Sequence, residues 1–349
     1  MDTVTHLLIG AAVAQLVNKV PTETNLSWQK CALLGAFSAV FPDIDYLLFF
    51  VNPLEFLAYW HRAETHSLIL APLWAWILSF LLRRFYHCTQ QTFLFKICLV
   101  GILSHIILDS FTTFGTQWFA PFSNYKVSWN LLFVVDVYFT FMSFVALMLI
   151  IYWRSHHYRL FALCLPMAYL TLVVIVKLAA YHQIPATESE KDASSLTLLP
   201  QPFSPLYWQV IKPTETGIKQ TYLMLSNDVI ATKLSEFFWQ YESKDNYQLP
   251  QQLIWRSYST VPKQNHWQAD AQQVWQQQKF AAFRDFAVYP VFYQYQKSST
   301  KVCVWFSDLR YHWPNIMPSF RIGMCRKNQQ SWQLYRMKYL SHEQIQRIY

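Results

Sequence analysis

Stretches of apolar residues dominate the first half of this 349-residue chain and limit what it can fold into. Several of them approach the roughly 20 residues that a helix needs to cross a bilayer. Backbone N–H and C=O groups find no water in hydrocarbon, so such segments must be helices. We therefore expect a polytopic α-helical membrane domain over residues 1–184 with about six helical segments. These are residues 3–17, 28–41, 67–82, 92–111, 131–153 and 160–181.

The first two segments are too short to cross a bilayer upright, because residues 3–17 and 28–41 number only about 15 each. They form either short, tilted helices or a hairpin that enters the membrane from one side. We expect the motif Pro42-Asp43-Ile44-Asp45 to end the second segment sharply.

Charge is divided unevenly between the two halves of the chain. Residues 1–185 hold 10 Lys and Arg against 8 Asp and Glu, whereas residues 186–349 hold 18 against 12. A membrane domain followed by a water-soluble domain is the simplest interpretation. Residues 185–205 are polar and contain four prolines, which is typical of a linker.

The last part of the chain, residues 206–349, has the patterns of a soluble α+β domain. Residues 266–283 are rich in Gln and Ala, with aromatics at helical spacing, and predict an amphipathic helix. Aromatic and β-branched residues predict strands elsewhere. The expected strands are residues 206–211, 218–225, 288–295, 301–309, 320–325 and 332–339.

Lys and Arg residues gather on one side of the predicted segments. The loops that connect the segments lie alternately on the two sides of the membrane. This holds whether the first two segments cross the bilayer or only enter it. By the positive-inside rule the side with more cations is cytoplasmic. We therefore expect a multi-pass protein of the bacterial inner membrane whose C-terminal domain is periplasmic. The cytoplasmic side receives Lys19, Lys30, Arg83, Arg84, Lys96, Arg154 and Arg159, and the other side receives Arg62, Lys126 and Lys177.

The net charge of +8 does not indicate nucleic acid binding, because no basic cluster or nucleic-acid motif accompanies it. The six cysteines include no Cys-x-x-Cys pair, which argues against a thiolate zinc site. Cys303 and Cys325 would lie in an oxidising compartment, on strands that could pair. Strand register decides whether they form a disulfide, and the sequence leaves this open.

Eight titratable residues at the ends of apolar segments all fall on the non-cytoplasmic side. That side was assigned from Lys and Arg alone, so their convergence is an independent observation. Such groups are costly near hydrocarbon, and a bound metal or a proton-transfer role would offset the cost. The eight residues are His6, Asp43, Asp45, His61, His66, His105, Asp109 and Asp136.

His105 and Asp109 are four residues apart, so they project from one face of a helix towards a common ion. One such pair alone is weak evidence, because a histidine on an apolar helix is more often a hydrogen-bonded core residue. The joint occurrence of several favours a metal site. Mixed nitrogen and oxygen donors suit one or two divalent ions, zinc above all, with manganese or iron as alternatives. The expected ligands are His6, Asp43, His66, His105 and Asp109, with Asp2 and His61 as additional candidates.

Two further residues keep alternative interpretations. Asp136 lies within an apolar run and is either a direct metal ligand or a residue that orients a ligating imidazole. Arg62 lies within the predicted cluster and either binds an anionic group of the substrate or pairs with Glu64.

Four motifs occur in order along roughly residues 1–180. They are Met-Asp-x-x-Thr-His at residues 1–6, Pro-Asp-Ile-Asp at 42–45, His-Arg-x-x-Thr-His-Ser at 61–67 and His-x-x-x-Asp-Ser-x-Thr-x-x-Gly-Thr at 105–116. With these motifs in this order the chain resembles the YdjM/YbcI-type bacterial inner-membrane, metal-dependent hydrolases. Ala63 stands where members often carry Gly, a departure that leaves both neighbouring histidines intact. The resemblance implies an integral membrane hydrolase with a metal site.

We therefore expect a membrane-bound hydrolase whose site opens at the outer face of the inner membrane. A divalent metal would lower the pKa of a bound water towards about 7, and an unligated carboxylate, Asp45 or Asp136, would take its proton. The location favours a phosphoester, in particular one of a membrane lipid, as substrate. The alternative is a non-enzymatic transporter or metal-binding scaffold, although polar residues that gather at one face suggest no path across the membrane.

Overall fold

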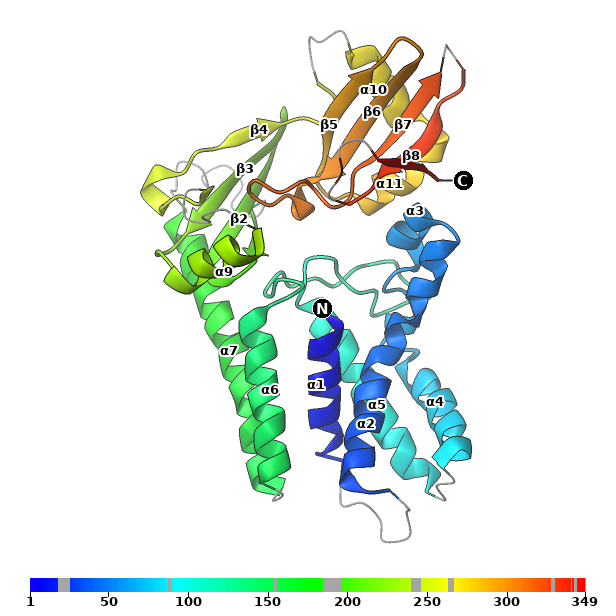
Figure 1. Cartoon of the computed structure of the whole chain (residues 1–349), viewed down its shortest axis with the longest axis vertical. Coiled ribbons are helices and arrows are strands. Elements are labelled where there is room, and N and C mark those ends of the chain that lie inside the picture. Colours follow the sequence, from blue (N-terminus) through cyan, green and yellow to red (C-terminus); the bar gives the residue numbers. More distant parts are fainter. Residues whose placement is uncertain are drawn as a thin grey trace. The chain divides into compact units, whose positions relative to one another are not determined.

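The computed structural model of the chain divides into two compact units (Figure 1). The first unit comprises Met1–Tyr46 and Arg62–Ala179, and the second comprises Leu47–His61 and Ala180–Tyr349. The first consists mainly of helices, whereas the second contains two antiparallel sheets. The structure describes residues 1–17, 26–86, 90–153, 156–184, 196–239, 246–262, 267–327, 330–339, 341 and 344–348.

Helices occupy each of the six apolar segments. The described residues contain three helical stretches long and apolar enough to cross a membrane, Trp28–Phe50, Gln91–Ser110 and His157–Gln183. A fourth arises if Pro53–His66 and Ala71–Tyr86, which meet at a bend of 71°, are counted as one span. Membrane helices in the first half are therefore supported, but the count of about six is not confirmed. The helices are α1 (Thr3–Ala14), α2 (Trp28–Val40), α4 (Ala71–Tyr86), α5 (Gln91–Ser110), α6 (Val137–Tyr152) and α7 (His156–Gln183).

The motif Pro42-Asp43-Ile44-Asp45 does not end the second segment. The α-helix α2 stops at Val40, but the chain continues directly as a 3₁₀-helix, η1 (Phe41–Phe50). Proline lacks the N–H that an α-helix would bond to the preceding turn, yet it fits the first turn of a new helix. Pro42 therefore changes the type of helix and leaves the chain helical.

Three glycines let α1, α2 and α5 approach until their backbones touch. A Cβ added to Gly35 would lie 2.3 Å from the Ala14 Cβ and 2.4 Å from the Gly10 carbonyl oxygen. A Cβ added to Gly101 would lie 2.9 Å from the Gly35 carbonyl oxygen. Any larger residue would push these helices apart, so the close packing depends on hydrogen as the side chain.

The second unit contains two antiparallel sheets and the short helices α9 (Val229–Trp239), α10 (Gln268–Gln276) and α11 (Ala281–Phe286), of which α10 and α11 lie between the two sheets in the chain. The segment predicted as the helix 266–283 is interrupted, because a 3₁₀ turn separates α10 from α11. The first sheet runs in the order β1 (Thr197–Gln201), β2 (Ser204–Thr214), β3 (Gly217–Met224) and β4 (Arg256–Tyr258). The second runs in the order β5 (Pro290–Lys297), β6 (Lys301–Asp308), β7 (Ile322–Lys327), β8 (Gln333–Met337) and β9 (Ile345–Arg347).

Part of the predicted linker 185–205 is strand. Residues 185–195 lie outside the described residues, but β1 begins at Thr197 and pairs with β2. Leu198, Leu199 and Pro200 are buried in this strand, so the segment belongs to the folded unit in spite of its prolines.

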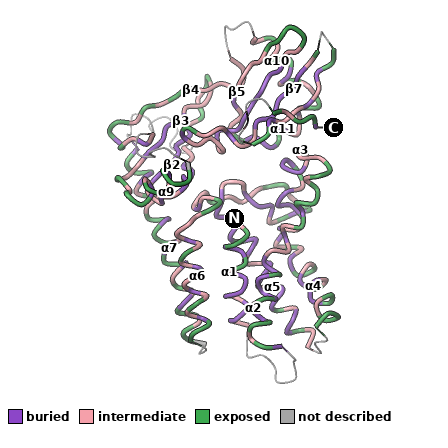
Figure 2. Tube along the Cα trace, viewed as in Figure 1, coloured by how far each residue is buried: buried purple, intermediate pink, exposed green. Residues whose placement is uncertain are grey.

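Aromatic side chains form the core of the second unit. Phe280 and Phe283 pack at 4.9 Å between ring centroids, and the ring of Phe280 lies 5.3 Å from that of Phe306 on β6. Trp305, the neighbour of Phe306, is also fully buried, and buried residues follow the central strands of this sheet (Figure 2). Burial of rings of this size supplies much of the driving force for folding.

Residues 47–61 join the second unit, although the sequence predicted one membrane domain up to residue 184. This segment contains α3 (Pro53–Glu55) and the π-helix η2 (Phe56–Trp60). The Tyr59 hydroxyl donates to Asp285 Oδ2 at 2.5 Å, and the Arg336 guanidinium lies 4.8 Å from the centre of the Phe49 ring. An aromatic insertion from the first half of the chain thus packs on the C-terminal fold.

Cys303 and Cys325 form a disulfide, which answers the question that the sequence left open. They are directly opposite each other on β6 and β7, with their Cα atoms 4.1 Å apart. Disulfides persist in oxidising compartments, so this pair would be stable in a periplasmic domain; that position of the second unit stays a prediction.

The glycine contact generates a prediction about stability. Gly35→Ala should destabilise the protein by about 1–3 kcal/mol, because the added methyl meets backbone atoms that cannot move aside. Helix propensity alone would favour alanine by about 1 kcal/mol, so the expected sign is opposite to the intrinsic one. Unfolding of purified protein in mixed detergent micelles measures the change. Leu33→Ala, at a side chain 66% exposed on the same helix, is the control and should have little effect. A Gly35→Ala protein as stable as the native one would refute the contact.

The disulfide generates a second prediction. In protein unfolded without reductant, Cys303 and Cys325 should resist alkylation while Cys31, Cys98 and Cys164 react. After reduction Cys303 and Cys325 should react as well, and peptide mass mapping distinguishes the two states. Labelling of Cys303 and Cys325 before reduction would contradict both the bond and the oxidising compartment.

Candidate metal centre

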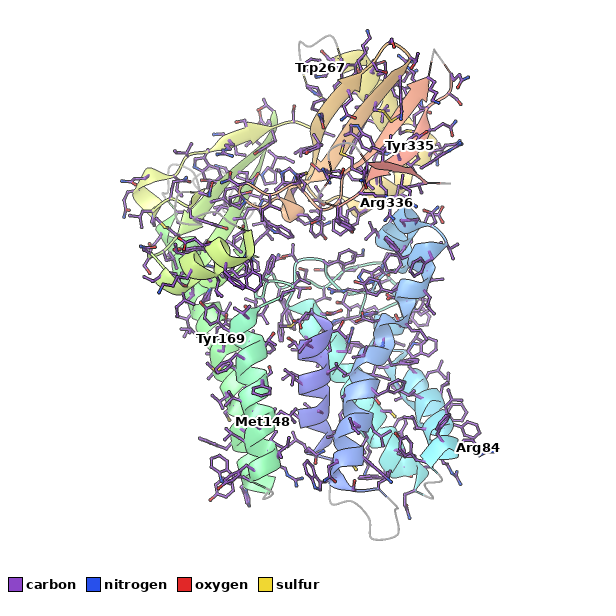
Figure 3. All side chains as sticks on the ribbon, in the orientation of Figure 1. Arg84, Met148, Tyr169, Trp267, Tyr335 and Arg336 are labelled. Carbon is purple, nitrogen blue, oxygen red and sulfur yellow. A yellow bond between two sulfur atoms is a disulfide. The ribbon has the colours of Figure 1, made fainter. Side chains whose placement is uncertain are left out.

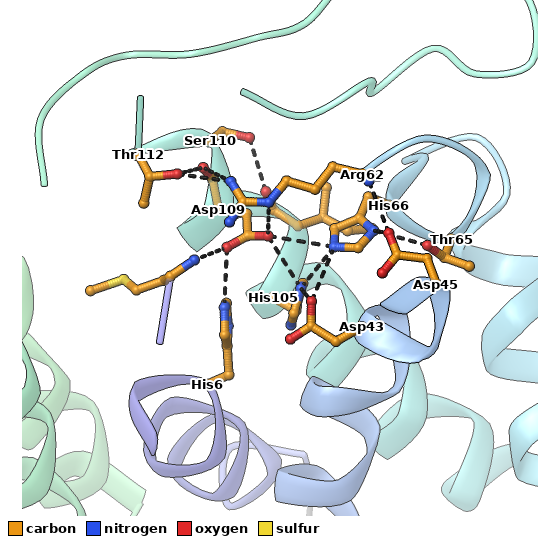
Figure 4. A network of polar contacts seen from close by, with 12 residues as sticks. His6, Asp43, Asp45, Arg62, Thr65, His66, His105, Asp109, Ser110 and Thr112 are labelled. Carbon is orange, nitrogen blue, oxygen red and sulfur yellow. Dashed lines mark hydrogen bonds and ion pairs between the residues drawn. The ribbon is translucent and has the colours of Figure 1, made fainter. Parts of the chain in front are cut away.

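Two histidines and two aspartates bring their donor atoms together in the first unit (Figure 4). Asp43 comes from η1, His66 from the 3₁₀ turn η3 (Glu64–His66), and His105 and Asp109 from the end of α5. One donor atom from each lies within 4.8 Å of the others. The spacing of four residues predicted that His105 and Asp109 share a helix face, and the structure has them side by side.

The separations between these donors suit a tetrahedral ion. His66 Nε2 and His105 Nε2 are 3.0 Å apart, and Asp109 Oδ2 lies 3.4 and 3.3 Å from them. Asp43 Oδ1 lies 3.7 and 3.6 Å from the same two nitrogens. Tetrahedral zinc with bonds of about 2.0–2.2 Å requires donor separations of about 3.3–3.6 Å. These five separations, between 3.0 and 3.7 Å, are therefore close to those that an ion among the donors would impose.

The partner of the outer ring nitrogen fixes the protonated nitrogen of His105. His105 Nδ1 lies 2.5 Å from the Ala39 carbonyl oxygen, which can only accept, so Nδ1 is the donor and Nε2 carries the lone pair. His66 Nδ1 lies 2.9 Å from Thr65 Oγ1, a hydroxyl that can donate or accept, and 3.7 Å from Asp45 Oδ2. With an ion bound, His66 would carry its proton on Nδ1, and both Nε2 lone pairs would face the ion. Two carboxylate oxygens at the same point favour a metal ion over a single extra proton.

Asp43 and Asp45 lie on either side of the His66 ring. Asp43 Oδ1 approaches Nε2 and Asp45 Oδ2 approaches Nδ1, each at 3.7 Å. The tight turn of η1 places both carboxylates around one imidazole. Asp43 can thus bind an ion directly while Asp45 holds the orientation of the ligating ring.

His6 contacts the group from the side of α1 and is not one of the four converging residues. Its Nε2 lies 3.1 Å from Asp109 Oδ1, and its ring stacks on that of His105 at 3.8 Å between centroids. Asp109 therefore faces the four-donor group with Oδ2 and His6 with Oδ1, the arrangement expected of a carboxylate that bridges two ions. The role of His6 as a metal ligand remains a prediction.

Arg62 pairs with Asp109, and Glu64 is not its partner. Arg62 Nε lies 2.9 Å from Asp109 Oδ2, and Nη1 donates to Thr112 Oγ1 at 2.8 Å. The Arg62 backbone N–H donates to Asp45 Oδ2 at 2.9 Å. Arg62 adopts φ 59°, in the left-handed region, and this conformation lets one residue bind two carboxylates. The Met1 amino group also contacts Asp109.

Three other predicted residues have roles in the fold. Asp2 caps α1 by accepting from Thr5 N at 2.9 Å. Asp136 caps α6 by accepting from Phe139 N at 2.9 Å and also receives the Tyr169 hydroxyl at 3.1 Å. No hydrogen bond joins Asp136 to a histidine among the described residues. His61 belongs to the second unit, where its ring packs 4.7 Å from that of Phe56.

Three further groups orient the site: the hydroxyls of Thr65 and Thr112 and the Ala39 carbonyl. The sequence predicted no role for them. Thr112 accepts from Arg62 and donates to the Asp109 carbonyl oxygen at 2.7 Å. Both threonines lie within the motifs that carry the family resemblance, and that position could have marked them as site residues. A backbone carbonyl such as that of Ala39 leaves none.

Comparison with known proteins supports the resemblance. The sequence model of the family described as YdjM inner membrane protein matches residues 1–181. The chain is also similar to the uncharacterized protein YfhP of Bacillus subtilis (strain 168), with 30% identity over 154 residues. That alignment covers 44% of this chain and 46% of the relative, so the chain spans less than half of the relative's length. No solved structure matches the chain.

The site generates a prediction about metal content. His105→Ala should lower metal affinity at least about 100-fold, because it removes one of four donors and the partner of the Ala39 carbonyl. Elemental analysis of purified, detergent-solubilised protein measures the content. Occupancy should also fall on acidification, since protons compete with metal for the two Nε2 atoms.

His157→Ala is the matched control, since His157 is exposed at the start of α7 and outside the group. The control protein should retain its metal. Full metal content in the His105→Ala protein would refute the assignment of the site.

Proposed function

The chain belongs to the YdjM inner membrane protein family, and from this premise we propose that it is a membrane-bound, metal-dependent hydrolase. The observation that carries the proposal is the convergence of Asp43, His66, His105 and Asp109 on one point. Buried histidines and aspartates are costly in apolar surroundings, so four with matched donor spacing indicate a site and not incidental core polarity.

The donor set limits the choice of metal. Two imidazole nitrogens and two carboxylate oxygens are ligands of intermediate softness that suit zinc, manganese or iron. The near-tetrahedral separations favour zinc. His6 and Asp109, which contact each other beside the four donors, would help to hold a second ion, so we propose one or two ions.

Accessibility determines where a substrate enters. Asp43 exposes 19% of its side chain, whereas those of His66, His105 and Asp109 expose at most 1%. A substrate therefore approaches past Asp43, and the other three donors stay shielded from water.

The chain supplies groups for hydrolysis around this point. A bound divalent ion would activate a water molecule at neutral pH and polarise the substrate. Asp45 keeps His66 in position, and we retain it, with Asp136 as the alternative, as the carboxylate that accepts the proton of that water. Arg62 Nη2 makes no hydrogen bond to a described residue, so it remains able to donate to an anionic oxygen of the substrate.

We propose a phosphoester, in particular of a membrane lipid, at the outer face of the inner membrane as the substrate. The asymmetry of Lys and Arg supports a non-cytoplasmic site, and the disulfide in the second unit supports an oxidising compartment on that side. A guanidinium beside the metal ligands suits an anionic ester better than a neutral one.

The proposal predicts metal-dependent hydrolysis. Protein reconstituted in vesicles should cleave at least one member of a panel of phosphomonoester and phosphodiester lipids, followed by release of phosphate or of the head group. A chelator should abolish turnover and zinc or manganese should restore it, because no activated water forms without the ion. His66→Ala should lower kcat at least about 100-fold, whereas Glu64→Gln, two residues away, should not.

The same vesicles test the non-enzymatic alternative. Metal-dependent ion flux without cleavage of any lipid in the panel would refute the hydrolase and favour a transporter. Cleavage that persists in His66→Ala protein would show that a contaminating enzyme was responsible.

A further inference from the structure

The second unit contains a cavity of about 230 Å³ at one end of its five-stranded sheet. Residues 319–322 before and at the start of β7, residues 336–339 at the end of β8, and Gln346 on β9 line one side. Phe49, Pro53 and Leu57 of the insertion line the other. The cavity is separate from the group of four metal donors, which lies in the first unit.

Arg321 lines this cavity and is fully buried, and its guanidinium carbon lies 5.8 Å from the centre of the Tyr293 ring. Its Nη2 donates to the Lys338 carbonyl oxygen at 2.7 Å, and its Nη1 reaches only the weak acceptor Met317 Sδ at 3.4 Å. Its Nε has no hydrogen bond. Among the residues that the structure describes, no carboxylate pairs with it. A guanidinium removed from water in this way requires an anion, and the fold as described does not provide one.

Two further cations stand at the same cavity. Arg336, labelled on the sheet in Figure 3, bonds the neutral side chain of Gln346 at 2.7 Å and covers the Phe49 ring. Lys338 is exposed at the edge. No Asp or Glu is among the described residues that line the cavity. Three positive charges with no carboxylate among the described lining residues attract an anion from solution or from a membrane surface.

The walls of the cavity are apolar. Much of the lining beside Arg321 comes from the apolar side chains of Phe49, Leu57, Ile322 and Met337. The volume exceeds the roughly 150 Å³ of a cavity that binds benzene, so the space holds an anionic group and several carbon atoms together. A small inorganic anion would leave these apolar walls unfilled.

We propose that this cavity binds an anionic amphiphile, a phosphate attached to an apolar chain, with the phosphate on Arg321 and the chain along Phe49 and Leu57. An anionic phospholipid has this chemistry, and so does a soluble phosphate ester with a short alkyl chain. The site does not depend on the metal centre and would supply lipid recognition to the C-terminal unit.

The test uses the whole protein, purified in a neutral detergent, with isothermal titration calorimetry. Short-chain phosphatidylglycerol should bind with one site per chain, whereas phosphatidylcholine of the same chain length and inorganic phosphate should each bind at least about tenfold more weakly. A short alkyl phosphate provides the soluble source, and affinity above that of phosphatidylglycerol would assign the site to soluble esters. Arg321→Met should abolish binding, because it removes the buried charge and keeps the volume.

The controls separate the binding site from the fold and from the proposed function. Arg321→Met should leave the thermal midpoint without ligand unchanged or raised, because an unpaired buried charge is lost. If that variant fails to fold, Arg336→Met, at a partly exposed position, should still weaken binding several-fold. Lys327→Met, an exposed charge on β7, and His105→Ala, in the metal centre, should bind like the native protein. Undiminished binding of phosphatidylglycerol by Arg321→Met and Arg336→Met, or equal affinity for inorganic phosphate, would overturn the proposal.

Discussion

The contact between the backbones of α1, α2 and α5 is the constraint from which the geometry of the site follows. Each of the three glycines in this contact lies one helical turn from a group in the site. Gly10 follows His6, Gly101 precedes His105, and Gly35 precedes Ala39. Where helices touch this closely, the two imidazoles can stack at 3.8 Å and a backbone carbonyl can reach a ring nitrogen. The arrangement of the donors is thus a property of helix packing and not of flexible loops.

The electrostatics of the site follow from the same packing. Three carboxylates lie around two imidazoles, and Arg62 contacts two of these acids. Its guanidinium pairs with Asp109, and its backbone N–H donates to Asp45. Removal of so many polar groups from water is favourable only if they satisfy one another or a common ion. Because the donors come from separate segments of the chain, an ion that binds them also stabilises the packing of those segments.

Much of this could be predicted from the sequence where the signal is local. The spacing of His105 and Asp109 placed both on one helix face, and apolar length placed helices in all six segments. The prediction that Pro42 ends the helix was wrong because proline also fits the start of a 3₁₀-helix. The partner of Arg62 could not be chosen from the sequence, because the choice depends on which residue lies nearby in space. The position of residues 47–61 in the second unit and the strand at Thr197 depend on tertiary contacts, which override the local preferences of aromatics and prolines. The cross-strand pairing of Cys303 with Cys325 required the strand register, which periodicity alone does not supply.

The small exposure of the donors has a consequence for how the protein acquires its metal. With only the Asp43 side chain reached by solvent, an ion would enter or leave the folded protein by the same narrow approach past Asp43 that a substrate takes. Exchange on that route is slow compared with exchange at an open surface site. The ion present in a purified sample would then record the metal supply during membrane assembly, and growth conditions, more than the relative affinities of the site, would decide its identity.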